Sequence, residues 1–419
     1  MGEGRGAGVG EPEAAFLLTR VPPEIADIAR RLLDAGHEAW YVGGAVRDAL
    51  VARAGGREVQ PGEVDIATSA RPADVQALFK RTVPVGIEHG TVAVLDRAGA
   101  THEVTTFRRD VRTDGRHAEV EFGVSLDDDL ARRDFTINAL AVHPVSGELR
   151  DPFGGRADLA AGVVRAVGDA ATRFREDRLR VLRALRFAAA LGFVVDAATW
   201  RALRAAAGDL AHLSRERVRD EWTKTLSRAR ASTAVALWRE AGVLEGVWPE
   251  LASLPADRDA ELDAVPRDPV LLTAAALWRA GAAPRAADQA ARRLRFSNKD
   301  ADRVRNVVEG LSAPRPDPSD GRAVRRWLSA LGGPIALDVA AAAAPADAAL
   351  AGAAARALEA RVPLSVADLA VTGEDLLGAG VPPGPAVGLA LRRLLEAVLD
   401  EPERNTQDDL LALVRASLT

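Results

Sequence analysis

The stretch from Trp40 to Ser69, which reads WYVGGAVRDALVARAGGREVQPGEVDIATS, constrains the possible fold more than any other part of this sequence. Its apolar start, Trp40 to Val42, predicts a short strand that breaks at Gly43 and Gly44. The residues that follow, AVRDALV, have helical spacing, so we expect a strand, a glycine turn and a helix in direct succession. A glycine pair at a helix start lets backbone N–H groups approach a phosphate closely.

Two acidic residues stand in the next predicted strand, EVDIA, which follows an intervening loop. Side chains alternate along a strand, so Glu63 and Asp65 should share one face while Val64 and Ile66 point to the other. Adjacent carboxylates repel each other unless a cation lies between them, and oxygen pairs of this kind suit Mg²⁺. The combination indicates a nucleoside triphosphate held by metal. Taken alone, the same residues are more typical of a glycine turn beside two surface acids on an edge strand.

Composition narrows the class of protein. A chain of 419 residues can form roughly two to four domains with sizeable cores. The sequence has no apolar run long enough to span a bilayer, and MGEGRGAGVGEPE lacks the apolar core of a signal peptide. The absence of cysteine excludes disulfides, thiolate metal sites and a cysteine nucleophile. We therefore expect a cytoplasmic protein without a membrane partner, and the net charge of −5 argues against one that coats nucleic acid all over.

The order of patterns predicts an α+β fold, in which a small mixed sheet flanked by helices precedes an all-helical remainder. After a flexible leader over residues 1–21, helical character is seen in PPEIADIARRLLDAG and RPADVQALF, and β-formers dominate GTVAVLD and THEVTTF. Strand signals end near Val167, and proline and glycine clusters at 313–321 and 381–385 indicate joints between helical parts. The alanine-rich segment 339–361 fits either a tightly packed helix or compositional drift; we favour drift and assign it no function.

A second charged stretch, LDDDLARRDFTIN, runs from Leu126 to Asn138. Arginines beside acids at a helix start can bind a triphosphate or its ribose through directed, often bidentate hydrogen bonds. By itself, the pattern is more typical of a solvated charged turn. The DPFGG turn at Asp151 to Gly155 predicts a structural role, because its glycines would let the sheet pack on the following helices.

A third stretch, EDRLRVLRALRF, predicts a helix from Glu176 to Phe187. Leucines at every third position from 179 to 185 should face a core, whereas Asp177 and Arg180 share a different face. This pair could be an exposed ion pair of little energetic weight. It could also read a base, because an aspartate that accepts from an exocyclic amino group beside an arginine that donates to the ring nitrogen would accept cytosine and adenine. Uracil and guanine would leave polar groups unpaired.

Together, the motifs resemble the bacterial class II tRNA nucleotidyltransferases, or CCA-adding enzymes, which share the polymerase-β-like nucleotidyltransferase superfamily with poly(A) polymerases. The resemblance rests on GGAVRD, EVDIATS, TVPVGIEHGTV, EVTTFR, DGRHAEVEF, LARRDFTINALA, DPFGG, EDRLRVLRALRF and SRERVRDEW. These follow the family's order and spacing between residues 40 and 230, and only generic helix is recognised beyond residue 250. The resemblance implies a nucleotidyltransferase head (22–167), a helical neck that reads the base and binds RNA (168–235), a helical body (236–330) and a helical tail (331–419).

The same resemblance implies an activity and its partners. The family adds CCA to the 3′ end of tRNA without a template, using CTP and ATP. Two Mg²⁺ ions would activate the terminal 3′-hydroxyl and stabilise the leaving pyrophosphate. The implied partners are therefore the 3′ end and acceptor arm of tRNA, CTP and ATP, and no obligate protein partner is evident.

Carried over by position, the resemblance assigns roles to individual residues. Glu63 and Asp65 would be the catalytic metal ligands, and Glu103 is a weaker third candidate on a neighbouring strand. The nucleotide-binding residues would be Gly43, Gly44, Arg47, Arg132, Arg133, Asp134, Asn138, Asp177 and Arg180. Supporting residues would be Asp48, Glu176, Glu216, Arg217 and Glu221.

One position departs from the family pattern, which usually has aspartate at both metal positions, whereas the first is Glu63 here. The added methylene moves the carboxylate about 1.5 Å farther from the backbone. The metal geometry must adjust to this, or activity falls. Because the surrounding motifs are intact, we expect a working enzyme.

Alternative activities on this scaffold differ at identifiable positions. A poly(A) polymerase would carry a basic GRRF-type element at 82–92, where this chain reads TVPVGIEHGTV. A CC-only enzyme would lack the flexible loop that is present from Arg108 to Phe122 and that we predict to move between C and A addition. An A-only enzyme can keep every motif seen here. An inactive RNA-binding homologue would use the basic excess of residues 150–230, with 17 Lys and Arg against 10 Asp and Glu.

Overall fold

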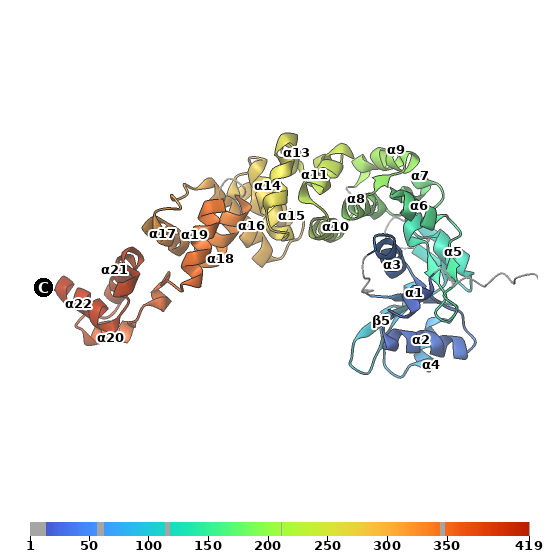
Figure 1. Cartoon of the computed structure of the whole chain (residues 1–419), viewed down its shortest axis with the longest axis horizontal. Coiled ribbons are helices and arrows are strands. Elements are labelled where there is room, and N and C mark those ends of the chain that lie inside the picture. Colours follow the sequence, from blue (N-terminus) through green and yellow to red (C-terminus); the bar gives the residue numbers. More distant parts are fainter. Residues whose placement is uncertain (1–13, 57–62, 114–117, 211, 344–347, 419) are drawn as a thin grey trace, which may run out of the picture. The chain divides into compact units, whose positions relative to one another are not determined.

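The chain divides into two compact units, residues 1–213 and 214–419 (Figure 1). The computed structural model describes residues 14–56, 63–113, 118–210, 212–343 and 348–418. The sheet belongs to the first unit, and the described part of the second unit contains helices and turns only. The boundary falls within the predicted neck, so the division into head, neck, body and tail stays a prediction.

Within the described residues, seven strands form one mixed sheet in the order β3-β4-β5-β2-β1-β8-β9. Their bounds are β1 Ala39–Val42, β2 Asp65–Thr68, β3 Thr82–Gly86, β4 Thr91–Leu95, β5 Thr101–Thr106, β8 Ala141–Val142 and β9 Leu149–Arg150. Strands β2 and β5 run parallel, and the other neighbours run antiparallel. With the helical remainder, this confirms the predicted α+β class.

Strand β2 lies inside the sheet, and its register places the acidic residues. Its first residue, Asp65, pairs with Val42, the last residue of β1, and therefore lies next to the glycine turn. The parallel register with β5 puts Asp65 level with Glu103. The predicted strand was too long at its start, because Glu63 lies in a bend before β2. Strand β1 ends opposite Asp65, so residue 63 has no partner on that side of the ladder.

One face of the sheet carries the main hydrophobic core of this unit. The helices that contribute to it are α1 (Ala15–Leu18), α2 (Pro23–Asp34), α3 (Gly44–Ala54) and α4 (Pro72–Leu78). Helices α2 and α4 lie side by side (Figure 1). Val64 and Ile66 are buried here, as the strand alternation predicts. Leu17 is buried in the same core, so the described end of the predicted leader packs on the sheet; residues 1–13 lie outside the described part.

The opposite face carries a smaller core beside α5 (Leu126–Ala131). Ala67 of β2 and Leu130 of α5 both belong to it. Side chains two apart on a strand share a face, so Asp65 points to the side of Ala67. The carboxylate therefore stands at the end of a buried strand, on the face that α5 covers.

The predicted mobile loop from Arg108 to Phe122 is an antiparallel ribbon. It consists of β6 (Arg108–Thr113) and β7 (Ala118–Phe122), and residues 114–117 lie outside the described part of the chain. Its base packs closely on the sheet unit, because a Cβ atom at Gly90 would lie only 2.6 Å from the ring of Phe122. The structure does not test the predicted movement.

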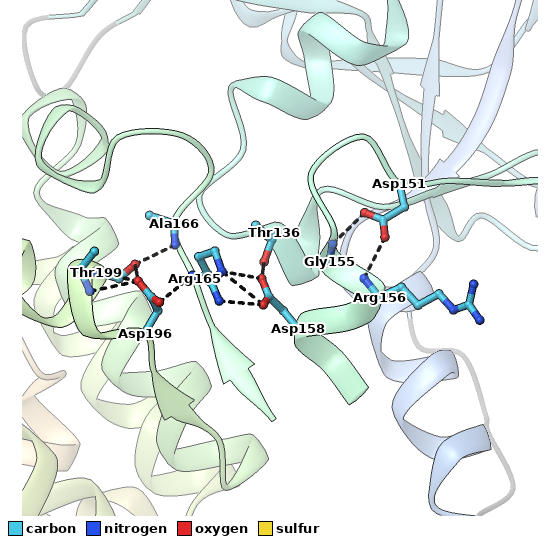
Figure 2. Close-up of polar contacts among 10 residues, drawn as sticks. Thr136, Asp151, Gly155, Arg156, Asp158, Arg165, Ala166, Asp196 and Thr199 are labelled. Atoms are coloured by element: carbon cyan, nitrogen blue, oxygen red, sulfur yellow. Dashed lines mark hydrogen bonds and ion pairs between the residues drawn. The ribbon is translucent and has the colours of Figure 1, made fainter. Parts of the chain in front are cut away.

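A polar network joins residues from segments that are far apart in the sequence (Figure 2). Asp158, in α6 (Gly155–Ala161), accepts a hydrogen bond from Thr136 Oγ1 at 2.6 Å and one from Arg165 Nε at 3.1 Å. Nη1 of the same arginine donates to Asp196 Oδ1 at 2.6 Å. Arg165 therefore bridges Asp158 and Asp196, which come from distant segments.

The DPFGG turn carries a separate set of hydrogen bonds. Asp151 Oδ1 accepts from the N–H of Gly155 at 2.7 Å and Oδ2 accepts from that of Arg156 at 3.0 Å, so its carboxylate caps α6 (Figure 2). A Cβ atom at Gly155 would lie 2.1 Å from the carbonyl oxygen of Thr136. Only glycine permits this approach, which supports the structural role predicted for the turn.

The remaining helices of the first unit are α7 (Ala170–Glu176), α8 (Leu179–Leu191) and α9 (Ala197–Ala206). Leu179, Leu182 and Leu185 of α8 are buried, as predicted. The prediction that strands end near Val167 is wrong, because β10 (Val163–Val164) pairs with a later short strand, β11 (Val194–Val195).

Buried tryptophans pack together near the start of the second unit, which is built from helices. These helices are α10 (Arg215–Arg228), α11 (Ala231–Glu240), α12 (Leu244–Val247), α13 (Pro249–Ala252), α14 (Pro269–Arg279), α15 (Pro284–Arg293), α16 (Asn298–Ser312), α17 (Gly321–Leu331), α18 (Gly333–Ala342), α19 (Ala348–Glu359), α20 (Gly373–Gly378), α21 (Pro385–Asp400) and α22 (Gln407–Leu418). The ring of Trp222 lies 4.9 Å from that of Trp238 and 5.7 Å from that of Trp248, between centroids. Across the described ranges, no helix is both long and apolar enough to cross a membrane.

The alanine-rich segment 339–361 is packed helix, so its interpretation as compositional drift is wrong for the described residues. Helices α18 and α19 contact each other, and Ala340 and Ala354 are fully buried. Small side chains allow this close packing of helices. Residues 344–347 of the segment lie outside the described part.

Replacing Gly155 with alanine should destabilise the first unit. The added Cβ would overlap the Thr136 carbonyl, so Gly155→Ala should lower the free energy of unfolding by at least about 2 kcal/mol. Gly208→Ala is the control, because no heavy atom lies within 4 Å of a Cβ at that position. Thermal denaturation should separate the two variants, and equal midpoints would contradict the close approach.

Candidate active site

The glycine turn at Gly43 brings charged groups from distant parts of the sequence together. Gly43 has φ 75° and ψ −132°, a conformation that L side chains rarely adopt. A Cβ atom there would lie 3.0 Å from Arg133 Nη1 and 3.8 Å from Asp65 Oδ2. Helix α3 starts at Gly44 without a side-chain cap from the described residues, so N–H groups of its first turn are available to an acceptor. We call Gly43, Gly44, Asp65 and Arg133 the Gly43 corner.

Asp65 is the carboxyl group of this corner, and its pKa is shifted. Burial raises its pKa from 3.8 to about 6, and the negative charge of Glu103 adds to the effect. Arg133 opposes the rise, and Glu63 contributes a smaller increase. The acidic pair predicted from EVDIA is therefore a trio, in which Glu103 of the neighbouring strand acts on Asp65 more strongly than Glu63 does.

The three carboxylates do not form a complete metal site by themselves. Among the described residues, no group of three or more His, Cys, Asp or Glu side chains is placed to hold a metal ion. Glu63 and Glu103 are exposed, while Asp65 is half-buried. An ion bound at Asp65 would need further oxygen ligands from solvent or substrate.

The two arginines of LDDDLARRDFTIN follow a helix instead of starting one, which corrects the prediction. Arg132 is the C-terminal cap of α5, and Arg133 comes next. Both converge on the buried carboxylate of Asp129, with Arg132 Nε 2.9 Å from Oδ1 and Arg133 Nη2 3.2 Å from Oδ2. Burial alone would raise the pKa of Asp129, but the two guanidinium groups hold it below its usual value. Asp129 therefore stays charged and fixes both cations.

Arg133 also has a hydrogen-bond donor without an acceptor. Its Nε is buried, and no described residue accepts a hydrogen bond from it. A buried unpaired donor costs about 1–3 kcal/mol. The donor belongs to the side chain that flanks Gly43 and Asp65, so an acceptor that reached it would relieve this cost.

Asp134 and Asn138 hold other residues in place. The carboxylate of Asp134 is buried and accepts from Asn138 Nδ2 at 2.9 Å and from Arg183 Nε at 2.7 Å. Burial alone would raise the pKa of Asp134, but Arg183 and the hydrogen bonds keep it below its usual value. Asn138 Oδ1 accepts from Arg47 Nη1 at 2.6 Å, and Arg47 Nε donates to Asp48 at 2.8 Å. The chain of contacts connects α3 with α8.

Asp177 and Arg180 do not lie on one continuous helix, contrary to prediction. Asp177 lies between α7 and α8 and accepts from the N–H of Leu179 at 2.9 Å. Arg180 is in the first turn of α8, with Nη1 2.8 Å from Glu176 Oε2 and Nη2 2.9 Å from the carbonyl oxygen of Arg132. Glu176 therefore orients Arg180, and the Arg132 carbonyl ties it to the segment that carries Arg133.

The last predicted group lies on α10 of the second unit. Glu221 is buried, and Glu216 lies 3.7 Å from Arg295. The N–H of Arg217 is capped by Ser214 Oγ at 3.4 Å. These contacts are local to the second unit, and a role in supporting the neck stays a prediction.

Sequence reasoning missed two positioning residues. Asp129 stands four positions before Arg133, so the approach of their side chains at the end of α5 could have been predicted from the spacing. Arg183 gave no such signal, because its partner Asp134 comes from a distant segment.

Comparison with known proteins adds independent evidence. The poly A polymerase head domain matches residues 39–165, the probable RNA- and SrmB-binding site of polymerase A matches 192–254, and the tRNA nucleotidyltransferase domain 2 (putative) matches 271–414. The crystal structure of a CCA-adding enzyme from Bacillus stearothermophilus in complex with CTP aligns with 95% of this chain and 98% of its own. The two are 33% identical, with a TM-score of 0.78. This chain belongs to the CCA-adding enzyme family.

Curated members of the CCA-adding family match over a shorter region. The Leuconostoc mesenteroides enzyme is 49% identical over 225 residues, and the Anoxybacillus flavithermus enzyme is 47% identical over 220. The chain spans about half the length of these relatives, 54% and 53%. A Thermotoga maritima CCA-adding enzyme complexed with tRNA is 22% identical with a TM-score of 0.66, which shows the shared fold alone. Nucleotidyltransferases of this family generally use divalent metal ions.

Neutralising Asp65 should stabilise the metal-free protein. Its pKa is about 6 in the folded chain and 3.8 ordinarily, so the folded state loses up to about 3 kcal/mol as the pH rises between these values. Asp65→Asn should therefore melt at a higher temperature than the natural chain at about pH 7.5, and the difference should vanish at about pH 4. Asp27→Asn, at an exposed acid of α2, is the control. A lower midpoint for Asp65→Asn at neutral pH would contradict the electrostatic account.

Proposed function

We propose that this member of the CCA-adding family adds CCA to the 3′ end of tRNA without a nucleic-acid template, using CTP and ATP and releasing pyrophosphate. The observation that carries the proposal is the Gly43 corner, where an uncapped helix start, the guanidinium group of Arg133 and the carboxylate of Asp65 meet. The whole-chain likeness to a relative in complex with CTP supports it. The cytoplasmic location expected from the sequence accompanies this proposal.

Mg²⁺ is the divalent ion that suits these ligands. It prefers oxygen, keeps several waters, and is usually held by one or two carboxylates together with substrate phosphates. Asp65 would be one ligand, and the negative charges of Glu103 and Glu63 act on it. When bound, two such ions would activate the terminal 3′-hydroxyl of the RNA and neutralise the departing pyrophosphate. The incomplete set of protein ligands fits ions that are completed by the nucleotide.

The protein's own groups would bind and orient the nucleotide. N–H groups at the start of α3 and the donors of Arg133 suit the negative oxygens of a triphosphate. Asp129 holds Arg133 in position, and the contacts through Asn138 hold Arg47 behind the turn. Arg180, fixed by Glu176, and the neighbouring Asp177 would read the base edge, as the sequence motif predicts.

Nucleotide addition to a tRNA that ends before CCA tests the proposal. With CTP, ATP and Mg²⁺ the natural chain should add C, C and A, and Asp65→Asn should lower the rate by at least about a thousandfold. Addition of A alone, a long A tail, or binding without addition would instead support an A-only enzyme, a poly(A) polymerase or an inactive homologue. Glu63→Asp should retain addition. If the natural chain adds nothing and Glu63→Asp recovers addition, the natural chain is not an active enzyme.

Arg183 should influence base selection without touching the nucleotide. Arg183→Lys keeps the charge but loses the planar fork that holds Asp134, so α8 should shift and discrimination of CTP against UTP should fall roughly tenfold in kcat/KM. The matched control is Arg178→Lys. Arg178 stands beside the start of the same helix, and its Nη2 lies 2.7 Å from Asp209 Oδ2. Equal discrimination in the two variants would show that Arg183 has no positioning role.

A further inference from the structure

Two arginines of the second unit have a backbone conformation that normally belongs to glycine. Arg295 follows α15 with φ 59°, and Arg361 follows α19 with φ 52°. Among the described residues, they are the non-glycine residues with positive φ. L side chains are strained in this region because Cβ approaches the carbonyl oxygen.

Both arginines end a helix with the same paired hydrogen bonds. The N–H of Arg295 donates to the carbonyl of Arg292 at 2.9 Å, and that of Phe296 donates to Ala291 at 3.1 Å. At Arg361, the corresponding bonds run to Leu358 at 3.0 Å and from the next residue to Ala357 at 3.4 Å. This is the Schellman arrangement, in which the left-handed residue is usually glycine.

The rest of the chain follows the usual rule. The same hydrogen-bond pattern ends α2, α11, α14 and α20, where the left-handed residues are Gly36, Gly242, Gly281 and Gly380. The fold therefore uses glycine when only the turn matters. Keeping arginine at residues 295 and 361 sacrifices stability, which indicates that the side chains themselves have a use.

The surroundings of the two side chains do not explain this use. The side chain of Arg295 is 69% exposed, and its nearest acid, Glu216, lies 3.7 Å away and is 54% exposed. By contrast, its helix neighbours Arg292 and Arg293 make ion pairs of 2.7 Å and 2.6 Å. Arg361 is exposed, and no ion pair or side-chain hydrogen bond involving it is found among the described residues. An exposed ion pair of this length contributes little.

We propose that Arg295 and Arg361 are RNA-backbone contacts of the second unit, each presenting its guanidinium group to a phosphate of the tRNA. A guanidinium group binds phosphate oxygens in a bidentate manner, and both residues lie within the match to tRNA nucleotidyltransferase domain 2. The inference rests on the proposed function, because tRNA is the polyanion that the reaction requires. The competing explanation is that each cation only stabilises the negative end of its helix.

Replacement by glycine distinguishes these explanations through tRNA binding, because the backbone strain is relieved in either case. With a phosphate contact, Arg295→Gly and Arg361→Gly should each raise the melting temperature by about 2–4 °C through relief of strain. Each should also weaken tRNA binding roughly fivefold and make the slope of log K against log salt less negative by about 0.7–0.9. Arg295→Lys and Arg361→Lys, which keep both charge and strain, should leave the melting temperature unchanged and retain most of the binding.

A charge-matched control is Arg285→Ala, at an exposed arginine on α15 itself. It should leave the salt slope unchanged. The inference is overturned if the glycine variants bind tRNA as the natural chain does, if they melt at a lower temperature with binding intact, or if Arg285→Ala weakens binding equally. Each comparison uses variants that still add nucleotides at saturating tRNA. If the natural chain adds no nucleotide, the proposed function fails, and that result is distinct from a failure of this inference.

Discussion

Three carboxylates near the start of β2, those of Glu63, Asp65 and Glu103, repel one another. The fold partly buries one of them, Asp65. Burial and the negative charges of Glu103 and Glu63 raise the pKa of Asp65 to about 6, and the positive charge of Arg133 only partly offsets this rise. Such an arrangement is unfavourable for folding and favourable for binding a cation. The stored repulsion, placed against a backbone turn that only glycine can form, is the physical basis of the proposed chemistry.

The residues around this corner are held by buried carboxylates that do not touch the nucleotide in our proposal. Asp129 fixes Arg132 and Arg133, and Asp134 links Arg183 to Asn138 and through it to Arg47. Each buried acid has its oxygens occupied by donors, so it fixes geometry without needing an open site. This separates the residues that would contact phosphate from those that position them.

Sequence patterns predicted the local elements well where spacing alone decides them. The strand at β1, the glycine turn, α2, α4 and the buried leucines of α8 follow from alternation and helical periodicity. Predictions from the sequence failed where tertiary contacts determine the structure. The register of β5 makes Glu103 a stronger neighbour of Asp65 than Glu63 is, and the break before α8 separates Asp177 from Arg180. The spacing of residues along the sequence does not show which strands pair. It also does not show where a helix breaks within a continuous charged motif.

The central claim is that a divalent ion and the phosphates of an incoming nucleotide meet at the Gly43 corner. The most direct measurement is a crystal structure with CTP and Mn²⁺, in which anomalous scattering locates the ion. The account predicts manganese bound to the Asp65 carboxylate and to a phosphate oxygen, at about 2.1 Å, with the guanidinium group of Arg133 donating to the nucleotide. A triphosphate bound elsewhere, or an ion that does not contact Asp65, would contradict it.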